Sequence, residues 1–114
     1  MVYDGPILDN HFHLNRRGLF LDAARQFQRV GGTDVVLVHC PDFSAPPETL
    51  EGHRLAYADT VAMAQSVREE VGIGVRVVLG PHPAAFAQQF ERWVNDEGES
   101  GKERAVENYR HSIE

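Results

Sequence analysis

The chain has 114 residues, 42% hydrophobic and 25% charged, which is the composition of one soluble globular domain. Eleven Lys and Arg against 17 Asp and Glu give a formal net charge of −6, which argues against an extended phosphate-binding face of the kind that coats a nucleic-acid duplex. The single cysteine, Cys40, excludes an internal disulfide framework and predicts a cytoplasmic location, while the lack of a signal peptide and of an apolar run of about 20 residues predicts no membrane association.

Residues 6–14 predict the first strand, because their apolar and polar side chains alternate with the period of two that a strand requires. One face is apolar and is expected to pack beneath helices; it carries Leu8, Phe12 and Leu14. The opposite face is expected to point into a concave site; it carries Ile7, Asp9, His11 and His13.

The rest of the chain alternates between helical and strand patterns. Apolar residues at three- and four-residue steps predict helices over residues 19–30, 53–71 and 84–94, and unbroken apolar runs predict strands over 33–39 and 75–79. A proline-rich loop spans 40–52, and a charged linker followed by weak helical periodicity runs from about 95 to the last residue. The order β-α-β-α-β-α over residues 1–114 predicts a single α/β domain with a parallel sheet.

His11 and His13 stand two residues apart on the predicted strand, so their side chains point the same way, about 6.6–7 Å apart at the backbone. Two imidazoles at this spacing can reach one cation at about 2.0–2.1 Å. Asp9 lies one pleat deeper and can accept a hydrogen bond from a ligand imidazole, which fixes its tautomer. We therefore predict a divalent-metal site at His11 and His13, against the alternative of two imidazoles in water on a surface strand.

Two further residues are expected beside this site. His39 ends the second predicted strand, and the carboxyl ends of parallel strands meet at one edge, so His39 is expected to line the same pocket. Arg17 follows the first strand in a loop, where its guanidinium can bind a phosphate or carboxylate of the substrate.

Two motifs carry a resemblance to a known family. The segment DNHFHL at residues 9–14 and the segment GPHP at residues 80–83 end the first and third predicted strands. Together they resemble the N-terminal part of the TatD-type metal-dependent hydrolases, within the amidohydrolase superfamily. The resemblance implies a (β/α)8 barrel, a fold that typically runs to about 250 residues. This chain would then be the first three βα units, an incomplete barrel.

The resemblance also implies an activity. His11 and His13 match the family's first-strand metal ligands, and His82 matches a histidine of the active-site mouth that contacts substrate. The cofactor would be one or two divalent ions, with zinc, magnesium, manganese and cobalt undistinguished. The substrate would be a small molecule or a nucleic-acid end with a phosphodiester, ester or amide bond. The bridging carboxylate and the general base are expected beyond Glu114, so residues 1–114 alone are expected to be inactive.

Two alternatives stay open. The chain is a non-catalytic half-barrel that completes itself by self-association, which is expected if the natural chain ends at Glu114, because an open three-stranded sheet leaves exposed edges. Alternatively, it is a PHP-type phosphoesterase, a class that also opens with a D-x-H-x-H strand and uses different later ligands.

Overall fold

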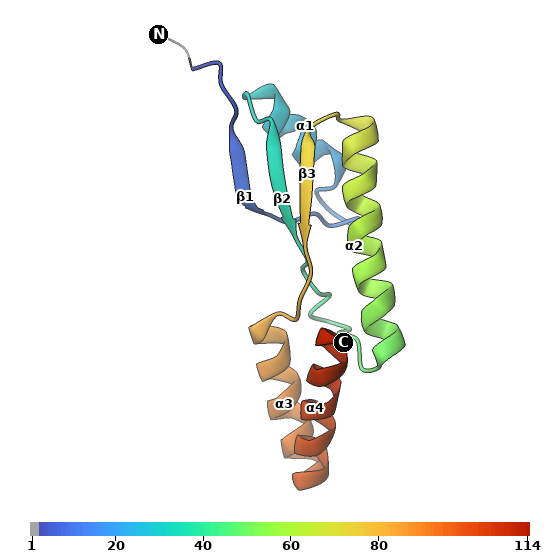
Figure 1. The fold of residues 1–114 in the computed structure, drawn as a ribbon. Helices are drawn as coiled ribbons and strands as arrows, with labels where there is room; N and C mark the ends of the chain where they lie inside the picture. The colour runs from blue at the N-terminus through green and yellow to red at the C-terminus, as the bar shows by residue number, and fades with distance from the viewer. Residues whose placement is uncertain (1–2) are drawn as a thin grey trace. The chain divides into compact units, whose positions relative to one another are not determined.

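The computed structural model describes residues 3–114, which form three strands and four helices (Figure 1). The chain divides into two compact units. The first consists of the chain up to His39 together with Asp59–Leu79, and the second consists of Cys40–Ala58 and Gly80–Glu114. Each unit has buried apolar residues of its own. Within residues 3–114, no helix combines the length and the apolar character needed to cross a bilayer.

The first unit contains a parallel sheet with the strand order β1-β2-β3. The strands are β1 (Leu8–Phe12), β2 (Asp34–Val38) and β3 (Gly74–Val78). Helix α1 (Leu21–Arg29) connects β1 to β2, and α2 (Leu50–Glu70) connects β2 to β3. The predicted order of these five elements and the α/β class are confirmed, with boundaries that differ by a few residues.

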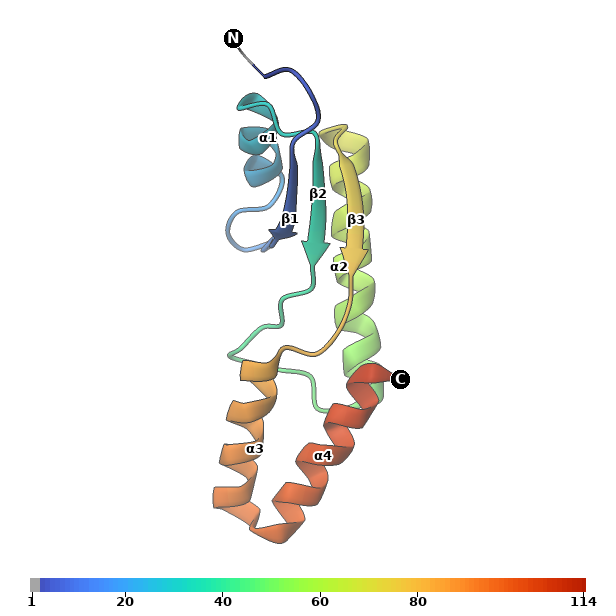
Figure 2. The same ribbon diagram turned by 60° about the vertical axis from the view of Figure 1, so that its left-hand side comes forward.

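One face of the sheet carries the core of this unit. Val35, Leu37 and Val75 are buried on it, and they pack against residues of α1 and α2, namely Ala24, Met63, Ala64 and Val67. Right-handed crossovers that proceed in one direction along a parallel sheet place successive helices on the same face. Figure 1 shows α1 behind the strands, and Figure 2 shows it to their left. The adjacent part of α2 packs against the same core.

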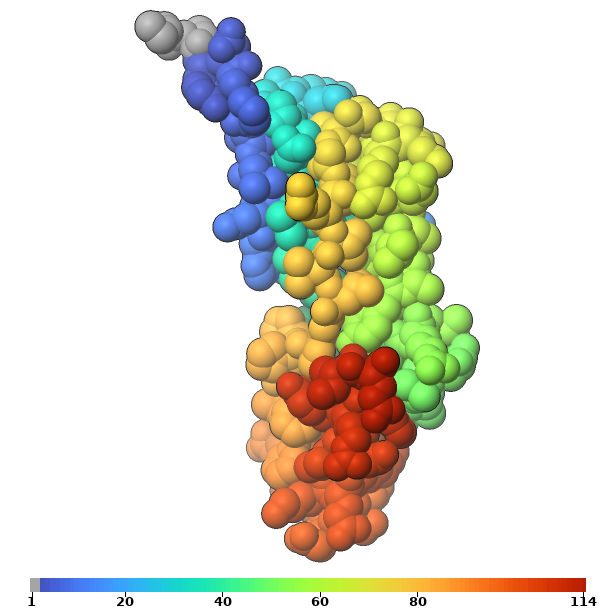
Figure 3. Space-filling view, in the orientation of Figure 1, coloured from blue at the N-terminus to red at the C-terminus, as the bar shows by residue number. Residues whose placement is uncertain are grey.

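The other face of the sheet has no helix of this unit on it, and Figure 3 shows atoms of all three strands at the surface. Leu8, which pairs with Asp34, is 57% exposed, and Val78 is 50% exposed. The prediction that Leu8 packs beneath helices is therefore wrong. Phe12 and Leu14 do pack against the core, as expected.

The second unit contains α3 (Pro83–Glu97) and α4 (Glu99–Ile113), which pack against each other. Only Gly98, with a φ of 66°, separates the two helices. The predicted charged linker after residue 95 is therefore wrong, since nearly all of it is helical. Glutamate and lysine are good helix formers, and a polar composition alone does not distinguish an exposed helix from a loop.

The prediction that the chain is the N-terminal part of a (β/α)8 barrel is also wrong. The sheet has three strands, and β1 and β3 are its two edges. Helix α3 was expected to cover the sheet as part of a third βα unit, but it belongs to the second unit and pairs with α4. The core beneath the sheet is built from α1 and α2. The architecture is a small α/β sheet unit together with a separate helical unit.

Candidate metal centre

An irregularity in β1 positions the histidines. Asp9 is in register with Val35 and Phe12 with Leu37, so three steps along β1 match two steps along β2. Asn10 and His11 therefore lie opposite the single residue Val36, which is the arrangement of a β-bulge. The bulge keeps Phe12 on the face that packs against the helices. His11 lies in the bulge, and His13 follows the last residue of the strand.

The rings of His11 and His13 approach each other closely. Their Nε2 atoms are 3.1 Å apart, and the ring centroids are 4.8 Å apart with an interplanar angle of 85°. Both side chains are exposed. The structure therefore brings the two predicted ligands together, with their Nε2 atoms at hydrogen-bond distance from each other.

The neighbouring strand orients one of these rings. His13 Nδ1 lies 2.9 Å from the carbonyl oxygen of Val38, the last residue of β2. A carbonyl only accepts hydrogen bonds, so Nδ1 carries the proton and donates it. Nε2 of His13 then keeps its lone pair, which is the state of a metal ligand. The sequence predicted Val38 as part of the second strand but not the contact of its carbonyl with His13, although its place at the end of the adjacent strand was a usable signal.

Asp9 has a different partner from the one expected. Its Oδ1 accepts a hydrogen bond of 3.0 Å from the backbone N–H of His11, rather than from an imidazole. Its register with Val35 places Asp9 on the same face of the sheet as that core residue. The carboxylate therefore fixes the backbone beside the histidine pair.

The spacing of the two nitrogens fits a shared ion. Two bonds of about 2.0–2.1 Å at a tetrahedral angle place their donor atoms about 3.3 Å apart. The 3.1 Å between the two Nε2 atoms is close to this value. In the described part of the chain, no group of three or more His, Cys, Asp or Glu side chains is arranged to hold a metal. Among residues 3–114, His11 and His13 are thus a pair of candidate ligands.

His39 and the two arginines also belong to the first unit. The ring of His39 is 9% exposed, and its Nδ1 is 2.7 Å from Thr60 Oγ1 on α2. Arg16 Nε donates to Asp59 at 2.7 Å. The Arg17 side chain is exposed and makes no hydrogen bond or ion pair with residues 3–114. Of the two adjacent arginines, Arg17 is therefore the one available to an anionic ligand.

His82 belongs to the second unit, where it caps a helix. Its Nδ1 accepts a hydrogen bond of 3.0 Å from the backbone N–H of Ala84, at the start of α3. Pro83 occupies the first turn of that helix, where a missing N–H is not a loss. The ring also makes an edge contact with Phe43, at 5.1 Å between centroids. The motif GPHP thus starts a helix in this chain.

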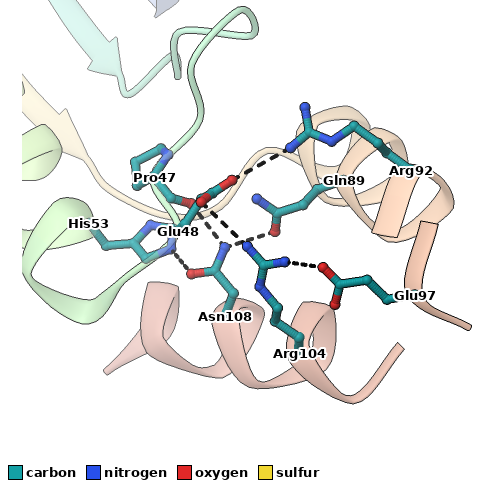
Figure 4. Close-up of polar contacts among 8 residues, drawn as sticks. All are labelled: Pro47, Glu48, His53, Gln89, Arg92, Glu97, Arg104 and Asn108. Atoms are coloured by element: carbon teal, nitrogen blue, oxygen red, sulfur yellow. Dashed lines mark hydrogen bonds and ion pairs between the residues drawn. The ribbon is translucent and has the colours of Figure 1, made fainter. Parts of the chain in front are cut away.

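The second unit also holds a polar cluster that sequence analysis did not predict (Figure 4). Asn108, 5% exposed, donates to the Pro47 carbonyl and to Gln89 Oε1, and its own Oδ1 accepts from His53. Glu48 lies 3.5–3.6 Å from two arginines, Arg92 and Arg104. Because the charges and hydrogen bonds within this cluster are matched, its arrangement is that of a structural network.

Comparison of the chain with protein-family models, with curated proteins and with solved structures finds no match. What the site can do is therefore argued from its geometry. His11 and His13 bring two imidazole nitrogens within 3.1 Å of each other at the end of a parallel strand. The Val38 carbonyl fixes the tautomer of one ring, and both imidazoles are open to solvent. Such a pair can bind a transition-metal ion while leaving other coordination positions free.

Proposed function

We propose that the chain acts in divalent-metal-dependent hydrolysis, with chemistry like that of the TatD-type hydrolases and with His11 and His13 as two metal ligands. The proposal concerns the chemistry of the site and no longer includes a barrel. The observation that carries it is the 3.1 Å separation of the two Nε2 atoms. The hydrogen bond from His13 Nδ1 to the Val38 carbonyl supports it as well, because ligand imidazoles usually donate their other nitrogen to a backbone or carboxylate oxygen.

The residues of this chain have separate roles in the proposal. His11 and His13 hold the ion, and the Val38 carbonyl accepts from Nδ1 of His13, which leaves Nε2 as the ligand atom of the neutral ring. A divalent ion at this place supplies Lewis acidity and an activated water for attack on an ester, phosphodiester or amide bond. Two imidazoles suit zinc and other imidazole-binding transition metals better than magnesium. One or two ions are compatible with the proposal.

The position of Arg17 supports the proposal that the substrate is anionic. Its guanidinium follows β1 in the chain and has no partner among residues 3–114, whereas the neighbouring Arg16 is paired with Asp59. A guanidinium binds phosphate or carboxylate through two parallel hydrogen bonds. We therefore include in the proposal a phosphate-bearing small molecule or a nucleic-acid end as substrate. The exposed thiol of Cys40, the single cysteine of the sequence, supports a reducing compartment such as the cytoplasm.

Metal binding and turnover test this function together. Zinc, cobalt and manganese are offered to the metal-free chain, and bound metal is measured by elemental analysis after dialysis. Hydrolysis of bis(p-nitrophenyl) phosphate is followed in the natural full-length gene product, because residues 1–114 alone are expected to be inactive. We expect His11→Ala and His13→Ala each to lower metal affinity by more than about tenfold, since loss of even an outer-shell partner costs about 10–100-fold. Turnover is expected to fall in parallel.

The matched control is His111→Ala. His111 lies on α4 and pairs with Glu107 at 3.2 Å, so its loss removes an imidazole of the second unit and leaves the histidine pair intact. We expect this variant to bind metal and turn over substrate like the unmodified chain. Unchanged metal content and turnover in both His11→Ala and His13→Ala would refute the assignment.

A further inference from the structure

The histidine pair occupies only half of a tetrahedral coordination shell. Zinc in closed protein sites takes four ligands, and His11 and His13 present two nitrogens at ligand separation. Both rings are exposed, so a second molecule can approach them. Two coordination positions of a bound zinc ion are therefore left for other groups.

We propose that a second copy of this chain supplies them, so that one zinc ion joins two chains through His11 and His13 of each. A tetrahedral metal ion can lie on the two-fold axis of a dimer, because rotation about that axis exchanges the two ligands of one chain with the two ligands of the other. Dimers with two-fold symmetry use the same surface patch on both subunits. The same pair of residues therefore completes the shell. This inference rests on metal binding by the histidine pair, which is part of the proposed function.

The surface next to the pair suits such a contact. His13 is hydrogen-bonded to the carbonyl of Val38, which pairs in register with Val78 of β3. These two valines lie on the face of the sheet that α1 and α2 leave uncovered, since Val35 and Leu37 point to the opposite face. Val78 is half exposed. The zinc contact therefore has apolar side chains beside it that a second copy can bury.

The charge of the chain makes the association depend on zinc. Each chain carries a formal charge of −6, so two copies repel each other when no metal is present. The backbone N–H of His11 is already bonded to Asp9, which leaves it unavailable to a partner strand. We expect monomers without metal and dimers with zinc.

The dimer has a consequence for the proposed hydrolysis. A site with four imidazole ligands is closed, whereas a catalytic zinc keeps a position for water or substrate. The zinc-linked dimer is therefore inactive, and activity belongs to chains in which the pair holds its own ion. Dimerisation and hydrolysis can be measured separately, so failure of one is distinguishable from failure of the other.

The test is sedimentation of the metal-free chain at increasing zinc, without substrate. At half an equivalent of zinc we expect the mass to double from the 12.8 kDa of one chain, with one zinc per two chains in the dimer fraction and reversal by EDTA. Cobalt at the same ratio is expected to give the intense visible absorption of a tetrahedral ion. His13→Ala is expected to stay monomeric, whereas the control His111→Ala forms the dimer.

Two results would overturn the inference. One is a chain that binds zinc and stays monomeric at half an equivalent, which leaves the proposed hydrolysis intact. The other is a zinc-dependent dimer that persists in His11→Ala and His13→Ala, which places the contact elsewhere. A dimer that forms as expected, together with a natural full-length gene product that has no hydrolytic activity at any zinc level, supports the inference and refutes the proposed function alone.

Discussion

Asn108 connects four segments of the second unit through one side-chain amide. Its two N–H groups are donated to Pro47 and Gln89, and its oxygen accepts from His53 (Figure 4). Buried polar groups that lose a partner cost about 1–3 kcal/mol each. We expect Asn108→Ala to lower the free energy of unfolding by at least about 2 kcal/mol, despite the better helix propensity of alanine.

Urea unfolding followed by the fluorescence of Trp93, the single tryptophan and a buried residue of the same unit, measures this loss. Asn95→Ala is the matched control, because Asn95 is an exposed residue of α3. That variant is expected to stay within about 0.5 kcal/mol of the unmodified chain. Equal stability of the two variants would show that the amide network contributes nothing.

Tyr57 is expected to lower the free energy of unfolding as the pH rises into the alkaline range. Burial raises the pKa of Tyr57, and the nearby Tyr109 adds to the shift. Below pH 10 or so, tyrosine keeps its proton in both states. Above that pH the unfolded chain loses this proton first, so the free energy of unfolding falls as pH rises.

The effect is isolated by comparing urea midpoints between pH 8 and pH 11 or so, a range that spans the ordinary tyrosine pKa. We expect Tyr57→Phe to be less stable at pH 8, because it lacks the hydrogen bond from the phenol to the Ser112 carbonyl, and to lose less stability at high pH. Tyr3→Phe, a change at an exposed residue of the other unit, is expected to keep the part of the slope that Tyr57 contributes. Parallel pH profiles for Tyr57→Phe and the unmodified chain would contradict the assignment.

At the scale of elements, the contact between α3 and α4 depends on a glycine. A Cβ atom at Gly101 would overlap the carbonyl oxygen of Trp93, so the two helix backbones approach too closely for any side chain. We expect Gly101→Ala to lower the free energy of unfolding by about 1–3 kcal/mol through overpacking. Helix propensity alone would raise the free energy of unfolding, because it favours alanine over glycine by about 1 kcal/mol. The expected change is therefore opposite in sign to the change that propensity predicts.

Trp93 fluorescence again measures this change, since the affected carbonyl is its own. Ser100→Ala, at an exposed position next to Gly101, is the control and is expected to change stability by less than about 0.5 kcal/mol. A gain in stability on Gly101→Ala would mean that the helices move apart at no cost.

The strands and most helices could be predicted because their signals are local. Valine-rich runs predict β2 and β3. Glycine residues next to several elements interrupt the apolar patterns and mark the boundaries of those elements. The bulge in β1 and the helix from Glu99 could not be predicted in this way. The bulge depends on how β1 pairs with β2, and α4 is stabilised by its packing on α3, including Arg104 stacked over Trp93 at 3.8 Å.

At the scale of the whole molecule, the alternation of strands and helices correctly predicted an α/β sheet but not its extent. The pattern in α3 is amphipathic, and an amphipathic helix packs equally well on a sheet or on another helix. Here its apolar residues meet α4, as the contact between Phe86 and Tyr109 shows, at 4.9 Å between centroids. The choice of partner is a tertiary property that the helical pattern does not contain. The barrel was implied by the resemblance of two short motifs, which do not determine how α3 packs.

The candidate site was predictable to a similar degree. The spacing of His11 and His13 led directly to the pair that the structure brings within 3.1 Å. The surrounding contacts needed coordinates, because the Val38 carbonyl and the Thr60 hydroxyl lie 25 and 21 residues from the histidines they meet. Asp9 was expected on the face opposite Phe12, but the bulge between them puts both on the face that packs against the helices. The carboxylate of Asp9 accepts from the backbone N–H of His11.

The bulge in β1 also bears on how the gene can change in length. In a regular strand, deletion of one codon moves every following side chain to the opposite face of the sheet. Asn10 and His11 share the single partner Val36, so loss of the Asn10 codon would restore one-to-one pairing while Phe12 stayed opposite Leu37. His11 and His13 would keep their spacing. The histidine pair therefore lies next to Asn10, a residue whose deletion would shorten the strand and leave the core side chains on the same face of the sheet.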